Sequence, residues 1–290
     1  MDRDYRFRIV NVFAESTFGG NPLCVFEDAR GLSDAEMQAL ARQFNLSETT
    51  FILPCKTATA AVRIFTPSHE LPFAGHPTLG SAHVIRELSG AGDDLRLQFK
   101  SAIVSVRAVG KEWSFIAPTV GKPALKPAGE PATMIAKLIG LEGTDLLGEP
   151  VWVNTGAEQL LIPVRSPDAV RRASLDTGLL DQWPINSLGR KTAYVFAFED
   201  GTQRSVLARY LFSQGGGIGE DPGTGSACAN LGGWLLHQAH PIPCQIVVSQ
   251  GAAVSRLCRL VLHLSAQREI RVGGTVRELA TGTVRLQEAV

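Results

Sequence analysis

The sequence predicts an α+β fold built from two similar halves, and three observations lead to this prediction. The stretch FAGHPTLGSA at residues 73–82 is repeated as GEDPGTGSA at residues 219–227, where a Pro, a Gly, a Ser and an Ala match at a constant offset of 145. This offset is half of the 290-residue chain. Most other segments have the composition of strands, and a strand with an arginine precedes each copy. We therefore interpret the chain as a tandem duplication of a strand–loop–helix unit.

The first half is predicted to be mainly β, with two helices. Residues 33–36, SDAE, have the form of a capping box, and apolar residues then recur at i, i+3, i+4 and i+7. This spacing predicts an amphipathic helix that ends at Asn45. Glu48 lies at the joint between that helix and a β-branched, aromatic strand at 49–53. Further strands are predicted at 8–12, 23–26, 60–65, 95–99, 103–109 and 113–117.

The second half repeats this order after a proline-rich segment. Residues 118–131 hold four prolines and two glycines, which predicts a linker at 119–131. Residues 278–286 have no counterpart in the second half and are expected to cross back to the first sheet. The predicted halves are therefore 1–118 with 276–290, and 132–275. Within the second half, helices are expected at 133–139 and from 166, and strands at 150–153, 159–164, 192–198, 244–249, 259–264 and 271–272.

The two helices that the repeat opens are predicted to lie inside the cores. Their sequences, PTLGSAHVI and PGTGSACANLGGWLL, carry small or apolar residues on every face. A helix that is apolar all round belongs in a core rather than on a surface. Each half is thus expected to wrap a sheet around its own central helix, and close packing explains Gly80, Gly232 and Gly233.

The composition favours a small-molecule partner. Because 28 basic residues balance 28 acidic ones, no net field attracts nucleic acid or an anionic membrane. No stretch reaches the roughly 18 apolar residues of a membrane span, and the charged N-terminus lacks the apolar core of a signal peptide. Five cysteines without C-x-x-C spacing are expected to be buried thiols. We expect a cytoplasmic protein with no membrane or nucleic-acid partner.

The repeat also predicts a binding site. Proline is favoured at the first helical position, so Pro77 and Pro222 are expected to place His76 and Asp221 at two N-caps. The amides that follow would point out of the helix ends and bind a carboxylate or phosphate. Two such ends, related by a pseudo-twofold axis, are expected to face each other across the cleft between the halves. The predicted substrate-binding residues are Gly75, Pro77, Thr78, Gly223, Thr224 and Gly225.

No nucleotide or other organic cofactor is predicted. The glycine-rich stretch QGGGIGEDPGTGS lacks the G-K-[ST] of a Walker A loop. It also lacks the third glycine that a dinucleotide-binding G-x-G-x-x-G motif requires. A small carboxylic acid is the expected ligand.

Several stretches resemble the signature motifs of the PhzF-like phenazine biosynthesis family. NLSETTF, FTPSHELPFAGHPTLG and GEDPGTGSA match in order and spacing, and VGGTVRELATGTVRL is similar to the family's C-terminal end. The resemblance implies a diaminopimelate-epimerase-like fold, in which each half is a β-barrel around a central helix. It also implies a homodimer.

The family resemblance further implies an isomerase that needs neither metal nor organic cofactor. In the phenazine enzyme a glutamate moves a proton during isomerisation of dihydro-3-hydroxyanthranilate, helped by a histidine, an aspartate and a serine. The matching positions are Glu48, His76, Asp221 and Ser226. One stretch departs from the family pattern: Q-G-x-x-x-G-R-P-S appears as QGAAVSRLC at residues 250–258. The natural substrate therefore stays open.

Two alternatives remain open at this stage. An amino-acid epimerase or racemase of the same fold would use two thiols that flank the substrate. Cys228 is the only thiol near the repeated motifs, and Ala82 and His83 occupy the matching region of the first half, which disfavours this chemistry. The second alternative is a non-catalytic carboxylate-binding protein, against which the intact Glu48, His76 and Asp221 argue.

We predict that the protein carries no functional metal. The sequence has no H-E-x-x-H motif, and prolines follow directly after His237-x-x-His240. We also predict that His83 has no acidic partner at the spacing of metal ligands. Elemental analysis of protein purified without added metal should therefore find no stoichiometric zinc or iron. A stoichiometric amount of either would contradict the prediction.

Overall fold

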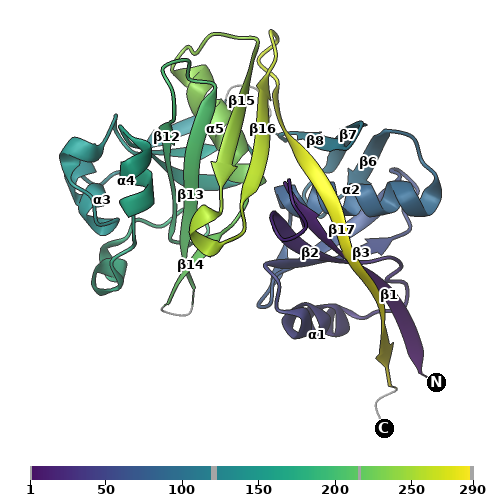
Figure 1. Ribbon diagram of the computed structural model, residues 1–290. Coiled ribbons are helices and arrows are strands. Elements are labelled where there is room, and N and C mark those ends of the chain that lie inside the picture. Colours follow the sequence, from purple (N-terminus) through teal and green to yellow (C-terminus); the bar gives the residue numbers. More distant parts are fainter. Residues whose placement is uncertain (1, 119–122, 215–216, 288–290) are drawn as a thin grey trace. The chain divides into compact units, whose positions relative to one another are not determined.

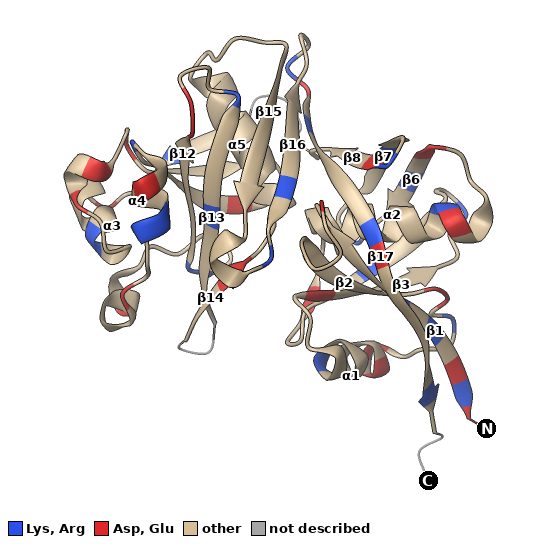
Figure 2. Ribbon diagram, viewed as in Figure 1, with Lys and Arg blue, Asp and Glu red and all other residues tan. Residues whose placement is uncertain are grey.

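The computed structural model describes residues 2–118, 123–214 and 217–287. The chain divides into two compact units (Figure 1). Unit 1 comprises Met1–Ile116 and Gly273–Val290, and unit 2 comprises Ala117–Val272. Figure 2 shows that acidic and basic residues are interspersed in both units. Within the described residues, none of the helices combines the length and the apolar character that crossing a bilayer requires.

Unit 1 is a closed barrel around one helix. Among its described residues eight strands pair in the cyclic order β17-β1-β2-β3-β4-β6-β7-β8 and back to β17. The β2–β3 and β4–β6 pairs are parallel. The strands of unit 1 are β1 (Arg3–Val12), β2 (Asn21–Phe26), β3 (Glu48–Leu53), β4 (Ala60–Phe65), β5 (Glu70–Leu71), β6 (Asp94–Gln98), β7 (Ile103–Val109), β8 (Glu112–Ile116) and most of β17 (Ile270–Leu286).

Helix α2 (Gly75–Ser89) fills this barrel, as its all-round apolar character predicts. It contacts seven of the ring strands, and its residues 75–82 are all buried. Helix α1 (Asp34–Phe44) packs against β3 and β4 instead. It begins with the predicted capping box at Ser33 and ends at Asn45, whose φ of 52° is left-handed.

Unit 2 arranges a similar series of strands around helix α5 (Gly225–His237). The β11–β12 and β13–β15 pairs are parallel, like their counterparts in unit 1, and α5 packs against β10, β11 and β16. The strands are β9 (Ala124–Pro127), β10 (Val151–Asn154), β11 (Glu158–Pro163), β12 (Thr192–Phe198), β13 (Ser205–Gln214), β14 (Gly217–Asp221), β15 (Cys244–Gln250), β16 (Cys258–Leu264) and the start of β17. The remaining elements are α3 (Ala132–Leu138), α4 (Pro167–Arg172), η1 (Gly143–Asp145), η2 (Thr177–Gln182) and η3 (Ala252–Val254).

The return of the C-terminal segment to the first sheet is confirmed. Residues 276–286 of β17 pair with the whole of β1, from Arg3 opposite Leu286 to Val12 opposite Val276. It is one continuous strand, whereas the sequence predicted two separate ones.

The prediction that the proline-rich segment holds no regular element is wrong. Strand β9 lies inside it and pairs antiparallel with β10, with Pro127 opposite Val151. Proline lacks the donor that a ladder needs, but a strand end tolerates this loss. Residues 119–122 of the predicted linker lie outside the described residues.

Glycine in the central helices allows close contact with the barrel wall. A Cβ on Gly80 would lie 2.6 Å from Leu23 Cδ2 and 3.1 Å from Val10 Cγ2, and one on Gly232 would lie 2.8 Å from Ile270 Cγ2. The packing role predicted for these glycines is confirmed.

We expect Gly80→Val to destabilise the protein by about 2 kcal/mol, because the added methyl groups have no space in the barrel. Gly92→Val is the matched control, since a Cβ there meets nothing within 4 Å. It should change stability by no more than about 0.5 kcal/mol. Urea denaturation of the two variants tests this, and equal midpoints would contradict the packing argument.

Candidate active site

Unit 1 brings two of the predicted catalytic residues together. Glu48 is the first residue of β3, and His76 lies in the first turn of α2. His76 Nε2 is 3.4 Å from Glu48 Oε2, and the two side chains are 5% and 17% exposed. The arrangement therefore holds a carboxylate and an imidazole in contact, with most of their surface removed from water.

The His76 ring is neutral at pH 7. Burial removes its hydration and lowers the pKa of His76 to about 3. The contact with Glu48 is thus not an ion pair at neutral pH. Asn21, which is fully buried, lies with Nδ2 3.2 Å from His76 Nδ1. The ring also interacts with the Pro22 carbonyl oxygen, and only the tautomer with its proton on Nε2 has a donor on the side of Glu48.

The predicted N-cap role of His76 is wrong. Helix α2 begins one residue earlier, at Gly75, with Ala74 as the N-cap. The Thr78 amide, predicted to point out of the helix end, instead donates to the Ala74 carbonyl oxygen at 3.3 Å. Pro77 is accommodated at the third helical position, where its missing N–H also costs no intrahelical bond. In the first turn, the amides of Gly75 and His76 have no helical carbonyl four residues earlier to which they can donate.

In unit 2, the predicted N-cap role of Asp221 is also wrong. Asp221 ends β14, Thr224 is the N-cap, and α5 starts at Gly225. Thr224 Oγ1 donates to Asp221 Oδ2 at 2.5 Å, so the carboxylate is tied to the cap. Gln250 Nε2 donates to the Asp221 carbonyl oxygen at 2.7 Å, and Gln250 Oε1 accepts from the Thr224 amide at 3.3 Å. The turn that contains Pro222 and Gly223 is thereby fixed before the helix begins.

Ser226 lies in the first turn of α5, next to Gly225. Its Oγ accepts a hydrogen bond from Gln159 Nε2 at 2.8 Å. Gln159 in turn contacts Asn230, which is fully buried one helical turn further along α5. Unit 2 therefore supplies a tethered carboxylate and a tethered hydroxyl close to the start of its central helix.

Comparison with known proteins identifies the family. A family model described as phenazine biosynthesis-like protein matches residues 10–282. The chain belongs to this PhzF-like family. The predicted family and fold class are thus confirmed.

The relatives place the PhzF-like chain among isomerases. An uncharacterised isomerase of Pasteurella multocida is 37% identical over 96% of this chain and 93% of the relative. The trans-2,3-dihydro-3-hydroxyanthranilate isomerase of Pseudomonas aeruginosa is 31% identical over 97% of this chain and all of the relative. A crystal structure of a Bacillus anthracis PhzF-family protein has a TM-score of 0.84 at 22% identity and covers 97% of this chain and 99% of its own, which shows the fold. The predicted activity class, an isomerase, is confirmed.

The stretch that departs from the PhzF-like pattern packs against the Asp221 turn. Gly251 has a φ of +83°, and a Cβ there would lie 2.5 Å from the Pro222 carbonyl oxygen. Ser255, which stands where the family pattern has Gly, has a left-handed φ of 56°. Ser255 therefore has a backbone conformation that a glycine at this position would adopt at no steric cost.

Cys228 does not have the properties of a racemase thiol. It is completely buried in α5, and burial raises the pKa of its thiol well above the usual range. A thiol that stays protonated cannot take a proton from carbon. The structure thus adds a physical argument against two-thiol epimerisation in this PhzF-like protein.

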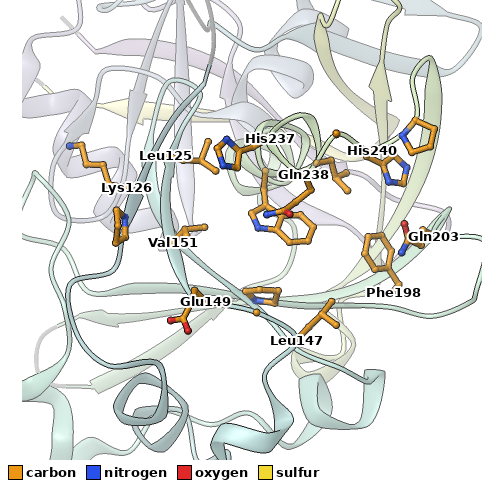
Figure 3. Close-up of a pocket in the computed structure, with 17 residues that line it drawn as sticks. Leu125, Lys126, Leu147, Glu149, Val151, Phe198, Gln203, His237, Gln238 and His240 are labelled. Atoms are coloured by element: carbon orange, nitrogen blue, oxygen red, sulfur yellow. The ribbon is translucent and has the colours of Figure 1, made fainter.

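Two other features lie away from these residues. A cavity of about 730 Å³ in unit 2 lies at the C-terminal end of α5 and is lined by Trp234, His237 and His240, among others (Figure 3).

In unit 1, His83, Glu87 and Glu278 have ligand atoms within 4.8 Å of one another. The prediction that His83 has no acidic partner is therefore wrong. Glu87 lies four residues further along the helix, and its Oε1 is 3.7 Å from His83 Nε2. The guanidinium of Arg8 pairs with both glutamates, at 3.0 and 2.8 Å, and also with Glu27, at 2.7 Å, so one positive charge is shared among three carboxylates.

We expect the buried neutral His76 to make stability depend on pH. Its pKa of about 3 in the folded state is below its ordinary value of 6.5, so the unfolded chain binds the extra proton first as the pH falls. The parent should therefore lose stability relative to His76→Gln between pH 7 and pH 5.5. The limiting slope is about 1.4 kcal/mol per pH unit. Urea denaturation across this range measures the difference, and a constant gap would show that the ring is not held neutral.

Proposed function

We propose that this protein transfers a proton within a small, unsaturated or cyclic carboxylic acid, with Glu48 as the base. The observation that carries the proposal is the contact between the Glu48 carboxylate and the neutral His76 ring, in a largely buried position at the start of α2. A neutral ring can donate one hydrogen bond to the carboxylate without supplying a proton to neutralise it.

The proposed reaction is an isomerisation that needs no oxidant or reductant. Glu48 takes a proton from carbon, the C–H electron pair moves into the adjacent unsaturated system, and the proton returns to another carbon. A positioned base contributes about 10²–10⁴-fold to such a step, and one fixed donor on the developing negative charge roughly 3–4 kcal/mol. In the tautomer with its proton on Nε2, His76 supplies such a donor beside the base.

Unit 2 is proposed to recognise the substrate's polar groups. The hydroxyl of Ser226 and the first-turn amides of α5 suit a carboxylate, because a helix N-terminus carries partial positive charge. The carboxylate of Asp221 suits a hydroxyl or an amino group. A substrate of the class named for the Pseudomonas aeruginosa relative carries all three groups on an unsaturated ring.

The proposed location is the cytoplasm. Among the described residues the five cysteines form no disulfide, which fits a reducing compartment.

Glu48→Gln is expected to lower turnover by at least about 100-fold while ligand affinity stays within a few fold, because the amide keeps the volume but cannot accept the proton. Glu70→Gln is the matched control, since Glu70 also begins a strand of unit 1 and is equally exposed, at 17%. The assay incubates the enzyme with dihydro-3-hydroxyanthranilate and related acids in heavy water and follows deuterium at carbon by mass spectrometry.

Each outcome of this assay has a defined meaning. If Glu48→Gln turns over a true substrate within about threefold of the parent, Glu48 is not the base. If the parent binds the acids but incorporates no deuterium, the protein is a carboxylate-binding protein and the catalytic proposal fails.

A further inference from the structure

A chain of hydrogen bonds in unit 2 runs from the backbone to Ser226. The Thr155 amide and its Oγ1 lie 2.8 and 2.7 Å from Asn230 Oδ1. Asn230 Nδ2 lies 2.6 Å from Gln159 Oε1, and Gln159 Nε2 lies 2.8 Å from Ser226 Oγ. Asn230, Gln159 and Thr155 are 0%, 5% and 3% exposed, so the chain is shielded from water until it reaches Ser226.

The direction of every bond in this chain is fixed by the backbone. A peptide N–H can only donate, so the Asn230 atom that faces the Thr155 amide must be the oxygen. Asn230 Nδ2 also lies 2.8 Å from the Ala157 carbonyl oxygen, which can only accept and so requires the same orientation. Asn230 therefore donates to Gln159, and the opposite end of the Gln159 amide, its NH₂ group, donates to Ser226.

The equivalent serine of unit 1 is used in the opposite sense. Ser81 Oγ donates to Thr50 Oγ1 at 2.9 Å. Thr50 Oγ1 in turn donates to the Cys24 carbonyl oxygen at 3.5 Å. The hydroxyl proton of Ser81 is therefore consumed inside the barrel. The Gln159 bond to Ser226 occupies a lone pair instead and leaves the hydroxyl proton to be donated elsewhere.

We propose that Gln159 and Asn230 are positioning residues that make Ser226 a hydrogen-bond donor to the substrate carboxylate. This inference rests on the proposed function, because it assigns a polarity to one of the groups that bind the acid. It selects a ligand with an acceptor oxygen at that position over one with an ammonium or amide N–H. This specificity comes from the hydrogen-bond chain Thr155–Asn230–Gln159–Ser226, which we call the relay and which begins at the Thr155 peptide group.

Gln159→Glu tests the relay because a carboxylate of the same shape can only accept. In this variant Ser226 must donate to the introduced carboxylate, and its proton is no longer available to the ligand. The probe is 3-hydroxyanthranilate, an aromatic acid that carries the same polar groups and cannot undergo the isomerisation, with its Kd measured by titration calorimetry. In the parent, Ser226→Ala should weaken binding about 10-fold or more, as expected for a hydrogen bond to a charged group.

The decisive comparison is a double-mutant cycle. In the Gln159→Glu background, Ser226→Ala should change the Kd by less than about twofold, because the hydroxyl no longer donates to the ligand. Simple repulsion between the introduced carboxylate and the ligand would weaken binding but leave the Ser226→Ala effect at its full size, which would overturn the relay. Gln238→Glu, an exposed position at the end of α5, is the control for added charge.

Asn230→Asp provides a second route if Gln159→Glu does not fold. The carboxylate of this variant can still accept from Thr155 but cannot donate to Gln159, so the Gln159 amide should turn over and accept from Ser226. The Ser226→Ala effect should again shrink to less than about twofold. If it keeps its full size, Asn230 does not set the polarity.

The remaining outcomes separate this inference from the proposed function. If the parent binds the probe and Ser226→Ala binds it equally well, Ser226 is not a donor to the acid and the inference fails, while Glu48 can still be the base. If the parent does not bind 3-hydroxyanthranilate, the substrate class fails and the assignment of Ser226 to that carboxylate fails with it.

Discussion

The burial of residues 75–82 of α2 on all sides is the constraint on which unit 1 depends. A helix without a polar face cannot lie on a surface, and only a sheet that closes around it removes its whole circumference from water. Close contact with the wall then requires small residues such as Gly80. The same closure places the first turn of α2 beside Glu48 at the start of β3, so the packing of the core also sets the geometry of the base.

The sequence was most informative where the signal is periodic or repeated. The repeat and the all-round apolar helices predicted the two central helices, and the capping box predicted α1. The helix starts were predicted wrongly because proline at N1 is only a preference. In unit 1, Pro77 is the third helical residue, and in unit 2 the turn held by Gln250 moves the start of α5 to Gly225.

The partners of the site residues could not be predicted from the sequence. Asn21 reaches His76 only because β2 and α2 meet in the barrel. Gln159 and Asn230 lie 71 positions apart and carry no motif. Such contacts depend on register between distant strands and helices, whereas the motif residues Glu48, His76, Asp221 and Ser226 stand next to local signals that the chain displays directly.

The continuity of β17 has a consequence for synthesis on the ribosome. Because β17 pairs with β1, β1 lacks one of its two neighbours until residues 276–286 leave the exit tunnel. All of unit 2 is encoded between the two segments of unit 1, so unit 2 has its complete sequence first. Nascent unit 1 is an open sheet with an uncovered edge throughout that interval, and such edges invite pairing with other chains. During synthesis, unit 1 therefore keeps an open sheet edge for longer than the order of the chain requires of unit 2.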